Sequence, residues 1–397
     1  MFRAVLYLPD DAALTLAGTS VSGRTLTVRA LVAALRAGAS MIAAPAALRD
    51  AAVDRALRQI PALAAAIRWI APGAEPPADA AATPWLLLPA STLIHVRTLG
   101  DLVVSPPPPG GAVLDVSAAG PAPVALVGQP LAGQIWKDVA MGRAVGADLT
   151  RRLEEARAER RGGAGPYLTV GSRADLPRAE ETLRSTLGIP ADSGVDRYLH
   201  RCVSRYITQV LVRTPITPNQ VSISSLVIGC AAIWGFWHAT AASAFLGILL
   251  YAIASIVDHS DGEIARLTFQ ESRFGANLDW TIDTIIHGGL VLTIGATAGG
   301  PLMLAVGVAA AAGVVLSALF AWYLPREIEV GAAVGGVLRN IANRDLFYLV
   351  LISAAVLRWL APPLVVVVAL LVAVGSQVYW VGCLVRIRCQ GREQTVS

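Results

Sequence analysis

The sequence predicts a chain of two structural classes: an α/β domain over residues 1–190 and an all-α membrane domain over residues 215–390. The composition is apolar, with 55% hydrophobic and only 15% charged residues and a mean hydropathy of +0.58. These values lie outside the usual range of soluble proteins. The apolar excess follows residue 217, whereas short β-like runs alternate with helical patterns before residue 190. Such alternation predicts layered strands and helices, and long apolar runs predict helices that cross a bilayer.

Short apolar runs in the first domain are the predicted strands. They are Ala4–Leu8, Ser40–Ala44, Trp85–Leu88, Ala112–Val116 and Pro123–Val127. Ala- and Leu-rich stretches at Thr27–Ala37 and Asp175–Leu187 are predicted to be helices that separate or follow them. We therefore expect an α/β layer fold with a mainly parallel sheet.

Residues 191–214, between the two domains, are predicted to form a juxtamembrane amphipathic helix. Arg197, Arg201 and Arg205 recur every four residues along one face. Another face carries apolar side chains, namely Leu199, Val203, Tyr206 and Val210. We expect this helix to rest at the membrane interface with its arginines near anionic headgroups. The alternative is a soluble linker helix.

Six apolar segments follow, each near the ~20 residues that cross a bilayer. They are 219–237, 240–258, 277–297, 301–324, 345–360 and 362–384. Arginines occur in the second and fourth connections and after the last segment, whereas the first and third connections carry no Lys or Arg. The positive-inside rule then places both termini in the cytoplasm. The chain start has no long apolar core typical of a cleavable signal peptide, so the first domain is expected to stay cytoplasmic.

Four carboxylates, Asp258, Asp261, Asp279 and Asp283, lie within or beside the second and third apolar segments. If these segments are antiparallel helices joined near residue 270, Asp258 lies level with Asp283, and Asp261 with Asp279. Spacings of three and four residues keep each pair on one helix face. Carboxylates are costly near lipid, so we expect these four to face a cavity and converge at one depth.

Four converging carboxylates need a counter-charge, and oxygen ligands favour hard cations such as Mg²⁺, Mn²⁺ or Ca²⁺. The sequence therefore predicts two divalent ions that could clamp a pyrophosphate. Gly262, Ala265 and Gly275 are small enough to let a bulky ligand approach the backbone, and Arg266 can bind phosphate oxygens. The alternative is that the acids only cap helix ends and form surface ion pairs.

The pattern DxxDGxxAR, eight residues, then GxxxDxxxD, resembles the signature of the CDP-alcohol phosphotransferase family. The resemblance covers roughly residues 195–390. It implies a six-helix membrane enzyme that transfers a substituted phosphate from a CDP-alcohol donor to an alcohol acceptor and releases CMP. The cofactors implied are two Mg²⁺ or Mn²⁺ ions. Lipid biosynthesis at a bacterial inner membrane, with the site facing the cytoplasm, is the expected setting, and the resemblance also allows a homodimer.

The resemblance also implies roles for single residues. Asp258, Asp261, Asp279 and Asp283 would hold the metals, and Asp283 would act as general base. The CDP moiety would be bound by Gly262, Ala265, Arg266 and Gly275, together with Asn219 of a Thr-Pro-Asn sequence that begins the first span.

The first domain is similar to sugar-phosphate nucleotidyltransferases in its Val21-Ser-Gly-Arg-Thr-Leu stretch and its closing helix from Asp175. Two features of those enzymes are replaced. Pro9–Leu14 stands where a Gly-rich phosphate loop is expected, and Pro89-Ala-Ser-Thr where an acid would hold Mg²⁺. We therefore expect a non-catalytic docking or regulatory module.

The remaining features of the composition exclude some partners and leave others open. The net charge of +4 and the lack of a Lys/Arg cluster argue against a nucleic-acid partner. The four cysteines and five histidines show no spacing typical of a metal site. A catalytically inactive membrane scaffold and a cation-binding transporter are the alternative functions. The substrates stay open: the donor could be CDP-diacylglycerol or a soluble CDP-alcohol such as CDP-inositol, and the acceptor an inositol phosphate, glycerol phosphate, amino alcohol or lipid alcohol.

Overall fold

The computed structural model describes residues 2–77, 83–105, 107, 111–115, 122–162, 165–187, 193–323 and 344–393. The chain forms two compact units, residues 1–186 and 187–397, and each is described by itself. The first unit combines a sheet with helices, and the second is helical in its described residues. The two predicted structural classes are thus confirmed.

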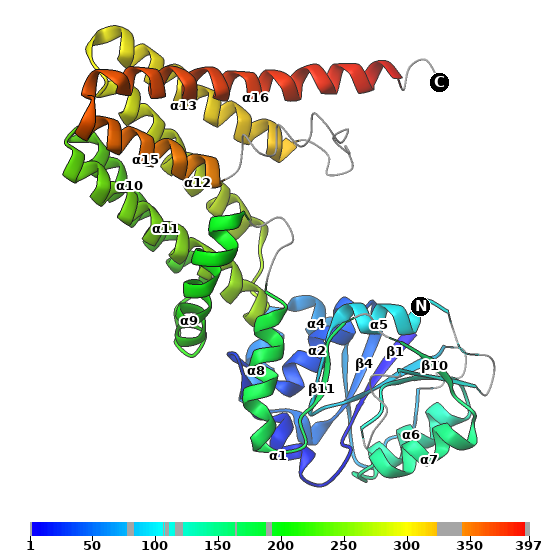
Figure 1. Ribbon diagram of the computed structural model, residues 1–397. Coiled ribbons are helices and arrows are strands. Elements are labelled where there is room, and N and C mark those ends of the chain that lie inside the picture. Colours follow the sequence, from blue (N-terminus) through cyan, green and yellow to red (C-terminus); the bar gives the residue numbers. More distant parts are fainter. Residues whose placement is uncertain are drawn as a thin grey trace. The chain divides into compact units, whose positions relative to one another are not determined.

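The first unit contains a mixed seven-stranded sheet with the strand order β10-β8-β9-β6-β1-β4-β5 (Figure 1). Its strands are β1 (Phe2–Tyr7), β4 (Ala39–Pro45), β5 (Ile67–Ile70), β6 (Trp85–Pro89), β8 (Ala112–Asp115), β9 (Ala125–Val127) and β10 (Glu159–Arg161). The pairs β1–β4, β1–β6, β4–β5 and β8–β10 are parallel, whereas β9 is antiparallel to both β6 and β8. All five predicted strands are present, and parallel pairs predominate.

The remaining elements of the first unit are short. The helices are α1 (Ala13–Ala17), α2 (Leu26–Arg36), α3 (Ala51–Gln59), α4 (Pro61–Ala66), α5 (Val96–Val103), α6 (Leu131–Ala140), α7 (Gly146–Glu155) and α8 (Leu176–Ser185). Two further strand pairs are β2 (Ser20–Val21) with β3 (Arg24–Thr25) and β7 (Thr92–Ile94) with β11 (Tyr167–Thr169). The predicted helices at 27–37 and 175–187 correspond to α2 and α8.

Buried polar groups tie the first unit together. The guanidinium of Arg29 on α2 is buried and donates to Val21 O at 2.8 and 3.1 Å, which fixes the β2–β3 turn. Burial lowers the pKa of Arg29 to about 9. On β1, an interior strand of the sheet, Tyr7 is fully buried and its hydroxyl donates to Pro123 O at 2.6 Å. These bonds satisfy polar groups that would otherwise destabilise the core.

Seven helices form the second unit where it is described. They are α9 (Arg201–Leu211), α10 (Pro218–Trp237), α11 (Ala241–Thr268), α12 (Arg273–Ala296), α13 (Gly300–Tyr323), α15 (Arg344–Leu360) and α16 (Val365–Glu393). Four segments are long and apolar enough to cross a membrane: Pro218–Trp237, Ala241–Thr268, Gly300–Phe320 and Pro362–Gly382. The other two predicted spans coincide with α12 and α15, so the six-span count stays a prediction.

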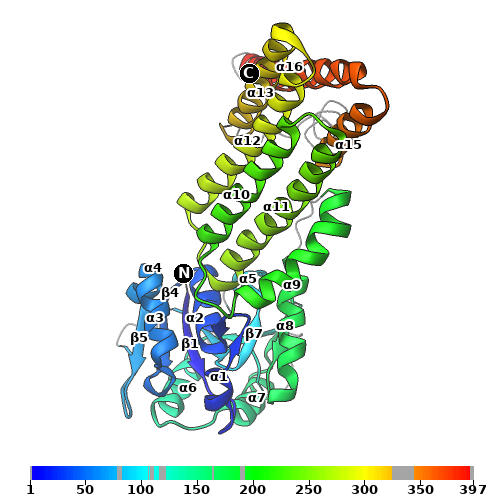
Figure 2. The same cartoon turned by 90° about the vertical axis from the view of Figure 1, so that its left-hand side faces the viewer.

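Close helix packing in the second unit depends on glycines. α10, α11 and α12 run side by side, and α13 packs on α12 (Figure 2). A Cβ on Gly295 of α12 would lie only 2.4 Å from Gly307 Cα of α13. A Cβ on Gly235 of α10 would lie 2.9 Å from the Ser243 carbonyl oxygen. Only glycine lets these backbones approach so closely.

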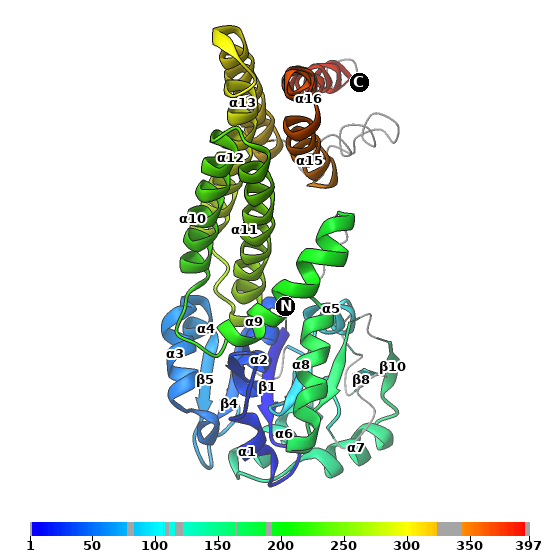
Figure 3. The same ribbon diagram turned by 60° about the vertical axis from the view of Figure 1, so that its left-hand side comes forward.

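The juxtamembrane segment differs from the prediction in its orientation. A π-helical turn (Asp196–His200) precedes α9, which packs against α11 (Figure 3). Its apolar side chains Tyr198, Tyr206 and Val210 are exposed, whereas Arg201 is buried. The expectation that Arg201 faces lipid headgroups is therefore wrong, because this arginine pairs with Glu263 of α11 at 3.0 Å. Residues 191 and 192 lie outside the described residues.

Candidate functional site

The two helices that carry the acidic motif form a tight hairpin. α11 ends at Thr268, and Phe269 adopts a left-handed conformation (φ 59°) while its N–H donates to Ala265 O. Ser272 caps α12, because its hydroxyl accepts from Gly275 N at 2.9 Å. A Ser cap satisfies a free N–H of the first turn and sets where the helix begins. The connection is thus residues 269–272, close to the predicted midpoint.

This hairpin brings the predicted aspartates together. Carboxylate oxygens of Asp258, Asp261 and Asp279 lie within 4.8 Å of one another. Asp283 joins them through Arg344 of α15, whose Nη2 lies 3.1 Å from Asp258 Oδ2 and 3.3 Å from both Asp283 oxygens. We call these four residues the aspartate cluster.

The aspartate cluster fits a divalent cation. Asp258 and Asp261 are buried, and Asp258 Oδ1 has no hydrogen-bond partner in the described part of the chain. A buried carboxylate oxygen without a donor is costly, and a cation would satisfy it. All the donor atoms are oxygens, which suits Mg²⁺ or Mn²⁺ better than zinc. Asp261 has a partner, since Oδ2 accepts a hydrogen bond from the Ser222 hydroxyl of α10.

The predicted CDP-binding residues line the same hairpin and the start of α10. A Cβ on Gly262 would lie 3.3 Å from the Arg266 guanidinium, so these two residues are neighbours on α11. A Cβ on Gly275 would lie 3.3 Å from Asn219 Oδ1, which places Asn219 next to the start of α12. Ala265 is half-buried one turn before the helix end. The structure thus places Gly262 beside Arg266 and Gly275 beside Asn219, and the roles of these residues stay predictions.

Sequence reasoning did not select Asp196 or His200, and it did not predict which groups Arg344 and His259 contact. Arg344 Nη1 donates to His259 Nδ1 at 2.9 Å and lies 3.4 Å from Asp196 Oδ1. Asp196 Oδ1 also accepts from His200 Nδ1 at 2.8 Å and from His259 Nε2 at 3.1 Å. Burial would raise the pKa of Asp196, but the hydrogen bonds from His200 and His259 hold it well below its ordinary 3.8. Asp196 is therefore an anion at neutral pH.

A second buried network fixes α9 on α11. Glu263 is fully buried, and its carboxylate accepts from Arg201 Nη1 at 3.0 Å, Ser204 Oγ at 3.0 Å and Thr208 Oγ1 at 2.7 Å. All three donors come from one face of α9. Glu263 lies between the motif residues Gly262 and Arg266, so α9 is bound to the helix that carries half of the aspartate cluster.

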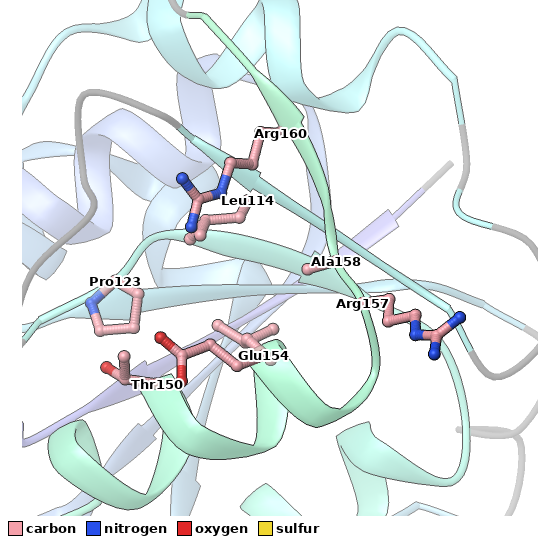
Figure 4. Close-up of a pocket in the computed structure, with 8 residues that line it drawn as sticks. Leu114, Pro123, Thr150, Glu154, Arg157, Ala158 and Arg160 are labelled. Atoms are coloured by element: carbon pink, nitrogen blue, oxygen red, sulfur yellow. The ribbon is translucent and has the colours of Figure 1, made fainter.

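A separate cavity of about 380 Å³ lies in the first unit. It is lined by α7 and by the strands β8 and β10, with Thr150, Glu154 and Arg160 among its residues (Figure 4). In that view Arg157 points away from the side on which Glu154 and Pro123 lie. No predicted site residue lies in this cavity.

Comparison with known proteins identifies a family match within the second unit. Residues 215–384 match the CDP-alcohol phosphatidyltransferase family model, so this part of the chain is a CDP-alcohol phosphatidyltransferase domain. The motif resemblance is thereby confirmed for these residues, whereas the likeness of the first unit to nucleotidyltransferases stays a prediction.

Curated relatives are similar over parts of the chain. A bifunctional IPC transferase and DIPP synthase of Rubrobacter xylanophilus is 35% identical over 151 residues, 38% of this chain and 34% of the relative. The protein of the same description from Thermococcus kodakarensis is 30% identical over 123 residues, 31% of this chain and 27% of the relative. An archaetidylinositol phosphate synthase of Methanothermobacter thermautotrophicus is 31% identical over 98 residues, 25% of this chain and 48% of the relative. The matches thus cover between about a quarter and a half of the length of these relatives.

Proposed function

We propose that the CDP-alcohol phosphatidyltransferase domain at residues 215–384 transfers a substituted phosphate from a CDP-alcohol donor to an alcohol acceptor, with release of CMP. The observation that carries the proposal is the meeting of Asp258, Asp261 and Asp279 from two helices, with one buried Asp258 oxygen lacking a partner. Surface ion pairs would not leave such an oxygen.

Each residue of the site has a proposed task. The aspartate cluster holds two Mg²⁺ or Mn²⁺ ions, which when bound neutralise the diphosphate and stabilise the departing CMP. Asp283 is exposed enough to reach an acceptor hydroxyl and takes its proton as the hydroxyl oxygen attacks phosphorus. Arg266 binds phosphate oxygens, and Asn219 contacts the CDP moiety. Gly262, Ala265 and Gly275 leave room for the cytidine. Positioning and charge neutralisation are the main requirements of this kind of transfer.

The acceptor we propose is a phosphorylated polyol of the inositol phosphate type. Support comes from the similarity to an archaetidylinositol phosphate synthase, whose name describes a product that contains inositol phosphate. The donor is a CDP-lipid or a soluble CDP-alcohol. In our proposal the domain crosses the membrane six times, with the aspartate cluster on the cytoplasmic side, where the arginine-bearing connections lie. The homodimer stays a prediction.

We propose that the first unit does not transfer nucleotides. The carboxylate of Asp10 accepts from Ala13 N at 2.8 Å, at the start of α1, where a phosphate-binding helix offers its N–H donors. The carbonyls of Leu8 and Pro9 accept from Val145 N and Gly146 N. The polar groups of the loop after β1 are thus hydrogen-bonded within the chain, where a nucleotidyltransferase would bind phosphate. This arrangement favours a docking or regulatory module over a catalytic one.

The test is CMP release by the purified full-length chain in detergent micelles, with CDP-diacylglycerol or CDP-inositol as donor and inositol phosphate as acceptor. We expect release that requires Mg²⁺ or Mn²⁺, is abolished by EDTA and falls by at least ~10²-fold in Asp283→Asn. Asp54→Asn, a half-buried acid of α3 in the first unit that pairs with Arg49, is the matched control and should behave like the parent. Metal-independent release, or full activity of Asp283→Asn, would overturn the proposal.

A further inference from the structure

The guanidinium of Arg344, at the start of α15, contacts both the aspartate cluster and Asp196. Its Nη2 contacts Asp258 and Asp283 of the aspartate cluster. Its Nη1 is directed to Asp196 and His259. The side chain is only 16% exposed, so its charge is balanced by these groups rather than by water.

The group around Asp196 is fully hydrogen-bonded without a cation other than Arg344. Because a carboxylate only accepts, His200 Nδ1 and His259 Nε2 must both donate to Asp196 Oδ1. A neutral His200 then accepts at Nε2 from the Tyr348 hydroxyl at 2.8 Å, and a neutral His259 accepts at Nδ1 from Arg344. Every donor in this group has an acceptor. Asp196 and His259 therefore form a preformed binding site for the Arg344 guanidinium.

The backbone next to Asp196 also holds α15. Gly194 N and Val195 N donate to the Asp345 carboxylate at 2.9 and 2.8 Å. A Cβ on Gly194 would lie 3.0 Å from Asp345 Oδ2, so glycine allows this close approach. Residues 193–200 of the juxtamembrane segment therefore fix the start of α15 at two adjacent residues, Arg344 and Asp345.

Divalent ions in the aspartate cluster would compete with Arg344 for Asp258 and Asp283, because like charges repel. Asp196 gives the guanidinium a second anion to which it can remain bound. We propose that Asp196 is a positioning residue that gives Arg344 an anion other than Asp258 and Asp283 to bind, so that the juxtamembrane segment favours the uptake of divalent metal by the aspartate cluster. The inference rests on the proposed function. It adds that divalent metal must displace the Arg344 guanidinium from Asp258 and Asp283 in order to bind.

The test is a titration of the purified full-length chain in detergent micelles with Mn²⁺, followed by the electron paramagnetic resonance signal of the free ion. Arg344→Gln removes the competing cation, so we expect Mn²⁺ to bind about fivefold more tightly than to the parent. Asp196→Asn removes the alternative anchor, so we expect binding to weaken about fivefold. In the Arg344→Gln background, Asp196→Asn should weaken binding by no more than about half that factor, since the competing guanidinium is gone.

The controls separate this inference from the proposed function. Arg197→Gln removes an exposed charge from the same helical turn and should bind Mn²⁺ like the parent. Asp258→Asn should lose tight binding; if it does not, or if the parent binds no Mn²⁺, the proposed metal site itself is refuted. If the parent binds through Asp258, two results overturn the positioning role: unchanged or weaker binding in Arg344→Gln, or equal effects of Asp196→Asn in both backgrounds. Thermal unfolding of each variant establishes that it is folded.

Discussion

The network around Glu263 leads to a quantitative prediction about the docking of α9. The Glu263→Gln substitution keeps the size of the side chain but removes the charge that pairs with Arg201. Arg201 has a side chain only 7% exposed and Glu263 is fully buried, so the remaining guanidinium would be a buried charge without its counter-ion. Breaking one partner of a buried pair costs about 3–5 kcal/mol.

A loss of about 3 kcal/mol changes an opening equilibrium by roughly a hundredfold, at 1.4 kcal/mol per factor of ten. Hydrogen–deuterium exchange of the α9 amides in detergent micelles measures this equilibrium. We expect exchange in residues 201–211 to be faster in Glu263→Gln by about that factor. Cys202→Ala, on the exposed side of α9, should leave exchange unchanged.

A paired substitution tests the physical cause. Replacing Arg201 by Met and Glu263 by Leu together removes both charges, and well-packed apolar pairs of similar size are often neutral relative to a buried ion pair. We therefore expect the double variant to recover part of the lost protection, because the Ser204 and Thr208 hydroxyls still lose their acceptor. Unchanged exchange in Glu263→Gln, or a double variant less protected than the single one, would refute the reasoning.

Three further predictions concern stability and are measured by thermal unfolding. Gly295→Ala should destabilise the second unit by roughly 1–3 kcal/mol, because its Cβ would lie 2.4 Å from Gly307 Cα, whereas Gly288→Ala, with open space around its Cβ, should not. Asp50→Ala should cost the first unit about 1 kcal/mol, since its carboxylate caps α3 by accepting a backbone N–H at 2.7 Å. Tyr7→Phe should cost about 1–3 kcal/mol, because it leaves a buried carbonyl without its donor. A Gly288→Ala loss equal to that of Gly295→Ala, or unchanged unfolding in the other two, would contradict these arguments.

Local patterns made much of the fold and part of the site predictable. The spacing of the four aspartates around a polar connection was sufficient to expect that Asp258, Asp261 and Asp279 meet, because helix periodicity and antiparallel pairing leave little freedom. The buried strands of the first unit were visible as apolar runs. Edge strands such as β10 were not, because the sequence Glu159-Arg-Arg has no apolar alternation.

The tertiary contact between Asp196 and Arg344 could not be predicted. Asp196 and Arg344 are 148 positions apart, and no periodic pattern joins them. The orientation of α9 was also misjudged at Arg201. A stripe of arginines on an amphipathic helix ordinarily faces water or headgroups, but a fully buried acid on a neighbouring helix reverses that preference. The sequence signal available was Glu263 itself, an acid with no obvious partner inside the motif.

The attachment of α9 to α11 determines where this polypeptide can be divided. A soluble fragment that ended at residue 214 would carry Arg201 away from Glu263 and leave Tyr198, Tyr206 and Val210 bare in water. Such a fragment should aggregate. A fragment that ends at Leu187 keeps the sheet and its helices but lacks these exposed apolar side chains. The boundary at which the chain can be divided therefore precedes α9, and it lies well before α10, the first helix long enough to cross a bilayer.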